Sequence, residues 1–406
     1  MRILKWISLG LGGLVVLAVL GMLVVVWFVD PNSFKSNIES AVRDATGRQL
    51  TLVGDIELGF FPWLALRAGE GRFANRPGFG TEPMVSWKSA QLGARLFPLL
   101  RGDLVAGQVI LRGADVRLVR RADGSANWEG MGSSEPAPAS DEKPMEIRIH
   151  GIRIEDSRLS FVDEAAGRRV AIADLDLTTD EIAPGEPLTD IEVSGVLHVT
   201  GFAPEGVPFR VEVPELIAPK DFSAIQVDSY EVALGGLQVE GGAQGTLGEH
   251  PRLAGAFESN RFDPRALLAS LGIQAPRTTD PKALGGLQLT GNWKFDDGAV
   301  ALEPFMLLLD ETTFSGSFRM GADDTTPGEF TLRGDRLDIA RYIPPPDPAS
   351  EPFVLPTAMI KALKFRGTVE LEQATLDAVE MKGVAIRLLL DEQGLRAVPP
   401  PAAAAP

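Results

Sequence analysis

Alternation of apolar and polar residues runs through most of this 406-residue chain and limits it to a fold built from β-sheets. In the stretch 146–161, EIRIHGIRIEDSRLSF, apolar residues recur two positions apart in three successive pairs. The stretches 170–182, 190–199 and 383–394 show the same pattern. Because neighbouring side chains of a strand point to opposite faces, this pattern predicts sheets with one apolar and one polar face. Glycines and prolines between the stretches predict the turns.

Two segments beyond the N-terminus predict helices instead. Residues 30–48 start with a capping Asp30 or Asn32, and Gly47 ends the helix. One side of this helix carries an apolar stripe that we expect to pack on protein, formed by Phe34, Ile38, Ala41, Val42 and Ala45. Residues 263–272, DPRALLASLG, predict a second and shorter helix.

The N-terminus predicts a membrane anchor. Residues 7–29 contain no charge, and at ~1.5 Å per residue such a helix can cross ~30 Å of hydrocarbon. Arg2 and Lys5 precede this stretch and Asp30 follows it, so the positive-inside rule predicts a cytoplasmic N-terminus. A cleaved signal peptide is the weaker interpretation, because the stretch is long and no Ala-x-Ala-like site precedes Asp30.

Composition excludes several kinds of partner and site. The 39 basic and 55 acidic residues give a net charge of −16, which argues against nucleic-acid binding. The absence of cysteine excludes disulfides and thiol chemistry. No cofactor is expected from these features.

Motifs for catalysis are also missing. The chain has no Gly-x-Ser-x-Gly elbow, P-loop, His-Glu-x-x-His motif or Rossmann fingerprint. Its three histidines, at 150, 198 and 250, have no partners at ligand spacing. Acidic pairs at 296–297 and 323–324 sit beside glycine and are typical of turns. We therefore expect no enzyme, no catalytic residue and no metal site.

Short internal matches indicate a weak repeat. FESNRFD at 257–263 resembles LRGDRLD at 332–338, and LLLDE occurs at both 307–311 and 388–392. With further matches around them, they predict units of roughly 75–80 residues that begin near residues 191, 287 and 363 and extend one sheet. The third unit stops after its LLLDE, before any Arg-x-Asp segment, so we expect a chain that ends mid-repeat or is truncated.

The apolar faces of roughly 20 predicted strands need a cover, and only two helices are available. A second sheet would give a sandwich, whereas a bound ligand would occupy an open trough lined by apolar side chains. Taken alone, the residues favour the sandwich, because burial of protein against protein is the commoner solution.

Several segments together resemble the AsmA family of bacterial envelope proteins. These segments are the anchor, the helix at 30–48, TLVGDIELGFFPWLAL (51–66), FANRPGF (73–79), the stretches 95–128 and 268–280, LLLDETTFSGSF (307–318) and LRGDRLDIARYIPP (332–345). The resemblance covers most of residues 1–395 in order. The family's C-terminal part usually continues past this point.

The resemblance implies an inner-membrane protein of outer-membrane biogenesis, with its bulk in the periplasm. It also favours the trough, because AsmA-like proteins are related to bridge-like lipid-transfer proteins with a hydrophobic β-groove. The expected fold is therefore mostly β: a transmembrane helix and a short amphipathic helix, then an elongated, curved antiparallel β-sheet groove built from weak repeats. The implied partners are the inner-membrane bilayer, phospholipid, and outer-membrane or assembly-machinery proteins, without nucleic acid.

We divide the chain and name its candidate site on this basis. The expected segments are a cytoplasmic tip and anchor (1–29), an AsmA-like helix plus β cap (30–130), a disordered linker (131–145), a repetitive β-groove (146–396) and a disordered tail (397–406). Alternating apolar positions predict groove-lining residues, namely Ile191, Val193, Leu287, Leu289, Phe365 and Val369.

The run FFPWLAL forms a separate candidate, a membrane-proximal aromatic cluster of Phe60, Phe61 and Trp63. We expect the cluster to plug the first strand's edge against the helix at 30–48, in preference to forming the lip where lipid enters. The expected function is binding of phospholipid acyl chains and help in their passage between membranes. The alternative is a β-rich scaffold that assists outer-membrane protein assembly without carrying lipid.

Overall fold

The computed structural model describes residues 30–59, 64–94, 105–130, 148–183, 185–200, 202–248, 250–322, 327–345, 365–391 and 394–398. The fold is mostly β, as predicted. None of the helices in these ranges is long and apolar enough to span a bilayer. The predicted anchor (7–29), linker (131–145) and aromatic cluster (Phe60, Phe61 and Trp63) lie outside the described residues.

The chain forms two compact units, which we call unit 1 (Met1–Ser157) and unit 2 (Arg158–Pro406). Unit 1 begins with the helices η1 (Pro31–Phe34) and α2 (Lys35–Thr46). Its strands are β1 (Leu50–Leu52), β2 (Ile56–Gly59), β3 (Leu64–Ala68), β4 (Gly71–Phe73), β5 (Val85–Trp87), β6 (Ser89–Ala94), β7 (Val105–Arg112), β8 (Asp115–Arg120), β9 (Arg148–Ile149) and the first half of β10 (Ile152–Asp163).

The predicted helix at 30–48 is present and ends as expected. The Asp30 carboxylate accepts a hydrogen bond from the backbone N of Asn32 at 2.9 Å, and Gly47 closes the helix with a left-handed φ of 67°. Its predicted apolar stripe is only partly covered by the described residues: Ile38 and Val42 are half-buried, whereas Phe34 is 49% exposed.

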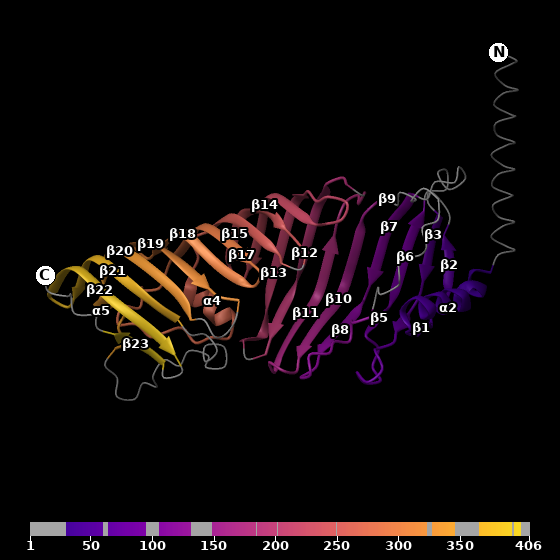
Figure 1. Ribbon diagram of the computed structural model, residues 1–406, viewed down its shortest axis with the longest axis horizontal. Helices are drawn as coiled ribbons and strands as arrows, with labels where there is room; N and C mark the ends of the chain where they lie inside the picture. Colours follow the sequence, from indigo (N-terminus) through magenta and orange to yellow (C-terminus); the bar gives the residue numbers. More distant parts are fainter. Residues whose placement is uncertain are drawn as a thin grey trace, which may run out of the picture. The chain divides into compact units, whose positions relative to one another are not determined.

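Unit 2 contains a long run of strands that pair in sequence order (Figure 1). They are β11 (Arg168–Thr178), β12 (Leu188–Val199), β13 (Phe202–Leu216), β14 (Ala224–Leu234), β15 (Leu237–Thr246), β16 (Arg252–Ser259), β17 (Leu287–Asp296), β18 (Ala299–Leu309), β19 (Thr312–Met320), β20 (Gly328–Asp338), β21 (Phe365–Leu376), β22 (Val379–Asp391) and β23 (Gly394–Val398). Each strand from β11 to β20 is antiparallel to the next. The sandwich that the residues alone favoured is absent from the described part of unit 2, where the strands form a single layer.

The expectation of an antiparallel sheet is wrong in two places: β7 of unit 1 pairs in parallel with β9 and with the start of β10, and a further parallel pair lies in unit 2. β20 and β21 pair in parallel, from Gly328 opposite Phe365 to Asp338 opposite Thr375. A parallel pair needs a long crossover, and here the connection contains the helix α5 (Ile339–Tyr342). β22 and β23 then return to antiparallel pairing.

Part of the predicted repeat has a structural counterpart. The segments 257–263 and 332–338 each end a strand and place an aspartate at the start of a helix, α4 (Pro264–Ser270) or α5. The Asp263 carboxylate accepts hydrogen bonds from the backbone N of Arg265 and of Ala266, at 2.8 and 3.2 Å. Asp338 caps α5 in the same way. The likeness stops there, because β17 returns antiparallel to β16 whereas β21 runs parallel to β20.

Extra residues interrupt the ladders inside several strands. The register shifts between residues 173 and 176 in β11, between 227 and 230 in β14, and between 302 and 305 in β18. A bulge of this kind bends its strand and increases the local twist. Bulges therefore bend the long strands of unit 2 in their interior.

Candidate functional site

One face of the unit 2 sheet is apolar along eleven strands, from β12 to β22, except near the strand ends. Residues directly opposite each other in paired strands point to the same side, so the register defines rows across the sheet. Row 1 consists of Val193, Val211, Val232, Val239, Ser259, Leu289, Leu307, Phe314, Gly334, Leu371 and Val384. We call the side on which this row lies the apolar face.

Two further rows lie on the apolar face, because their residues are two or four positions from those of row 1, or five where the bulge of β14 or β18 adds one residue. Row 2 consists of Tyr230, Gly241, Phe257, Gly291, Phe305, Gly316, Leu332, Val369 and Ile386. Row 3 consists of Val227, Ala243, Gly255, Trp293, Leu302, Phe318, Phe330, Gly367 and Leu388. None of the three rows contains a charged residue.

The six predicted groove residues all lie on this face. Val193 and Leu289 belong to row 1, and Val369 belongs to row 2. Ile191, Leu287 and Phe365 are two or four residues from these along the same strands, and so share their side. The structure brings the six to one surface but spreads them over three strands, β12, β17 and β21, and contact with lipid stays a prediction.

The apolar face is only half covered by protein. Val232, Val239, Leu289 and Leu332 remain half-buried, whereas a second sheet would bury them. Two small cores are found at one margin. Leu267 of α4 packs with Leu234 against a cluster that contains Val207 and Leu271. Ile339 of α5 packs against a second cluster, formed by Phe314, Leu371 and Ala374.

A network of hydrogen bonds and ion pairs around Asp310, which we call the rim network, stabilises this margin. Asp310 follows β18 and is 6% exposed. Its carboxylate accepts hydrogen bonds from the backbone N of Leu284, Gly285 and Gly286 at 2.8, 2.9 and 3.1 Å. The hydroxyl of Tyr342, at the end of α5, donates to the same carboxylate at 2.7 Å.

The protonation states of Asp310 and Tyr342 follow from these contacts. Burial on its own would raise the pKa of the Asp310 carboxyl, but the hydrogen bonds from Tyr342 and from the three amides outweigh it and lower that pKa. Burial, followed by the hydrogen bond to Asp310, raises the pKa of the Tyr342 hydroxyl. Asp310 therefore stays charged and Tyr342 stays protonated at neutral pH.

Arg341 extends the network to two more carboxylates. Its guanidinium donates to Asp280 at 2.8 Å and to Glu311 at 2.7 Å. Together these contacts join α5, the segment 280–286 and the turn between β18 and β19. Sequence reasoning missed this role of Asp310 and Tyr342, although the repeated LLLDE, which contains Asp310, was a usable signal.

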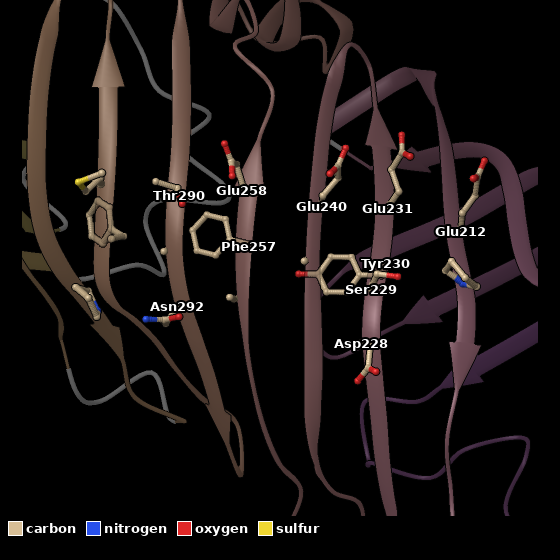
Figure 2. Close-up of a pocket in the computed structure, with 17 residues that line it drawn as sticks. Glu212, Asp228, Ser229, Tyr230, Glu231, Glu240, Phe257, Glu258, Thr290 and Asn292 are labelled. Atoms are coloured by element: carbon tan, nitrogen blue, oxygen red, sulfur yellow. The ribbon is translucent and has the colours of Figure 1, made fainter. Parts of the chain in front are cut away.

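The opposite face of the same strands is polar and carries a row of acids. Glu192, Glu212, Glu231, Glu240 and Glu258 lie directly opposite one another on β12 to β16, and we call them the glutamate row. Figure 2 shows four of them at one level of neighbouring strands. Arg210 pairs with Glu192 and Glu212, at 3.0 and 3.2 Å.

A shallow hollow of about 850 Å³ lies along the glutamate row. Its lining includes Glu212, Glu231, Glu240 and Glu258 (Figure 2), and none of the six predicted groove residues. Across the described ranges, no group of three or more histidines and carboxylates is placed to hold a metal ion. The hollow is also lined by Tyr230, Phe257 and Phe305 of row 2, so residues of both faces border it.

The net charge of the chain is carried by unit 2. Residues 158–406 contain 21 basic and 38 acidic residues, whereas residues 1–157 contain 18 and 17. Unit 2 is therefore strongly acidic although one face of its sheet has three rows without any charge. Its acidic residues are concentrated on the polar face, the turns and the margins.

Comparison with known proteins gives two matches. The family model described as the AsmA family matches residues 1–201. Protein AsmA of Escherichia coli (strain K12) is 28% identical over 161 residues, which cover 37% of this chain and 25% of that protein. The aligned part thus spans a quarter of its curated relative, and most of the apolar face lies beyond the family match. No solved structure matches the chain significantly.

Proposed function

The chain belongs to the AsmA family, and from this premise we propose that the apolar face of unit 2 binds phospholipid acyl chains and assists their passage between the membranes of a bacterial envelope. The proposal includes an inner-membrane anchor at residues 7–29 and a periplasmic position for the remainder. The observation that carries the proposal is the apolar face itself, which has three uncharged rows and which the described residues cover only at the margin held by α4 and α5.

The energetics favour a passive mechanism. An acyl chain loses ~0.8 kcal/mol for each methylene group that moves from hydrocarbon into water. A chain that passes from a bilayer onto the apolar face exchanges one apolar surface for another, so its transfer costs little. The headgroup stays in solvent at the open side of the face, and no catalytic residue is needed. Direction then depends on a gradient or a partner.

The charge of unit 2 supports this arrangement. Its surplus of acidic residues disfavours adsorption of its polar face onto an anionic bilayer surface, because like charges repel within a Debye length. Lipid would therefore meet the protein at the apolar face. A scaffold that carries no lipid is the alternative, and the following experiment separates the two.

A pair of adjacent residues provides the test. Leu289 lies on the apolar face and Thr290, next to it on β17, lies on the polar face opposite Glu258. A photo-crosslinking amino acid is placed at either position of the full chain, in cells, and crosslinked material is analysed for phospholipid by mass spectrometry. We expect lipid adducts at Leu289 and none at Thr290. Equal yields at both positions, or no adduct at either when crosslinks to protein do form, would overturn the proposal in favour of the scaffold.

A further inference from the structure

Glycine and aromatic residues face each other across neighbouring strands of the apolar face. In each pair the glycine stands directly opposite the aromatic residue in the register. Seven of these pairs are Gly195 with Phe209, Gly241 with Tyr230, Gly255 with Trp293, Gly291 with Phe305, Gly334 with Phe314, Gly328 with Phe365, and Gly367 with Phe330. All seven lie on the same side of the sheet, within or beside rows 1 to 3.

At six of the seven glycines a ring atom or ring hydroxyl of the partner lies within 3.2 Å of the place that a Cβ atom would take, whereas at Gly291 the nearest atoms are the Cβ and Cα of Phe305 and the carbonyl oxygen of Pro304. A Cβ on Gly328 would lie 2.5 Å from two ring carbons of Phe365. One on Gly241 would lie 2.7 Å from the hydroxyl oxygen of Tyr230, and Figure 2 shows that ring reaching across β15. These six side chains therefore lie against the neighbouring strand at its glycine. At Gly241 and Gly255 a backbone carbonyl oxygen, of Ala256 and of Gly242 respectively, would also meet the Cβ.

Glycine–aromatic pairs can also serve stability alone, since a ring shields the backbone that glycine leaves bare. Two features point beyond that role. The pairs occur on the face that no second layer covers, and they recur from β12 to β21. In a covered core a ring can stand upright and interdigitate with the opposite layer. On an open face an upright ring would project into the space above the sheet.

We infer that these six glycines hold the aromatic side chains flat and thereby set the clearance above the apolar face, so that this face selects lipids by their acyl chains and not by their headgroups. The inference rests on the proposed function. Rings that lie flat against the sheet leave an even apolar surface on which an extended, unbranched acyl chain can lie. Rows 1 to 3 contain no charged residue that could pair with a phosphate or an amine, so this face has no group that distinguishes one headgroup from another.

Gly328 is the sharpest site for a test. Its hypothetical Cβ meets Phe365 first, and the nearest backbone atom, the carbonyl oxygen of Arg319, is 3.3 Å away. Gly328→Ala should therefore lift the Phe365 ring and leave the ladder in place. Adding Phe365→Leu removes the ring and restores the clearance. Ser317→Val, which adds bulk to the polar face of the neighbouring strand β19, is the matched control.

The measurement uses the full chain, loaded from vesicles that hold phosphatidylethanolamine and phosphatidylglycerol with identical acyl chains. Bound lipid per protein is counted by mass spectrometry. For Gly328→Ala we expect a fall of about fourfold for each methylene that loses contact. The double variant and Ser317→Val should load like the parent, and all should take up the two headgroups equally.

The outcomes separate the two claims. A parent chain that binds no lipid refutes the proposed function itself. A parent chain that binds lipid, with Gly328→Ala loading as well as Ser317→Val, refutes the role of the glycines, and so does a loss that Phe365→Leu fails to restore. A preference for one headgroup refutes selection by acyl chain. Should Gly328→Ala not fold, Gly334→Ala tests the same point, because its Cβ would first meet side chains, a ring carbon of Phe314 and a methyl of Leu371, both at 2.7 Å.

Discussion

Removal of the Tyr342 hydroxyl should loosen the margin that α5 and the segment 280–286 form on the apolar face. That hydroxyl donates at 2.7 Å to Asp310, whose carboxylate also accepts from three backbone amides and is almost fully buried. A hydrogen bond to a charged group contributes roughly 1.5–3 kcal/mol. For Tyr342→Phe we therefore expect the opening free energy of this margin to fall by about that amount.

The amides that bind Asp310 report this change directly. Hydrogen exchange at Leu284, Gly285 and Gly286 should accelerate roughly tenfold to 100-fold in Tyr342→Phe, since 1.4 kcal/mol corresponds to a factor of ten. The chain has one other tyrosine, and Tyr230→Phe is the matched control because it leaves these amides untouched. Exchange at 284–286 that is the same in both variants would refute a stabilising role for the hydroxyl.

Acid should weaken the rim network in a defined direction. The pKa of Asp310 is lowered in the folded chain from its usual value of about 3.9. Its stabilisation is thus complete above that usual value and is lost as the pH falls through the lower, folded pKa. In Asp310→Asn the protection of the 284–286 amides should be low at neutral pH and should not fall further in acid. A parallel acid dependence in variant and parent would contradict this assignment.

Three other perturbations test the remaining features. Glu240→Gln in the middle of the glutamate row should raise the free energy of unfolding in urea by about 0.2–1 kcal/mol, because like charges stand opposite one another there. Added salt should reduce this gain, and a loss of stability would contradict the repulsion. Asp263→Ala should cost about 1 kcal/mol of unfolding free energy through the lost cap of α4, with Asp263→Asn retaining most of it; equal losses in both would argue against capping. Leu289→Asp should abolish co-purification of phospholipid while Thr290→Asp keeps it, and retention in both would count against the apolar face as the lipid site.

Several features of the fold follow from local sequence. The alternating stretches predicted β10, β11, β12 and β22, because the side-chain period of a strand is set within the strand itself. The same period placed residues such as Ile191 and Val193 on one side without knowledge of their neighbours. Helix α4 was predictable because an aspartate cap acts on amides only two and three residues away.

The candidate site was less accessible to sequence reasoning. Asp310 and Tyr342 are 32 residues apart, and nothing local to either residue indicates the other. The glutamate row joins five separate strands, and its alignment depends on every turn and bulge between them. Shifting one register by a single residue would move a glutamate to the other face.

The sequence by itself determined which segments are strands, which side of each strand is apolar and where two helices begin, since all three depend on interactions within a few residues. Only the tertiary structure decided that the strands of unit 2 form one layer, that β21 runs parallel to β20, and that glycines such as Gly241 and Gly328 stand opposite rings on the apolar face. These properties depend on pairing between segments far apart in the chain. Because pairing energies depend on register, bulges and crossovers together, no single stretch contains enough information to specify them.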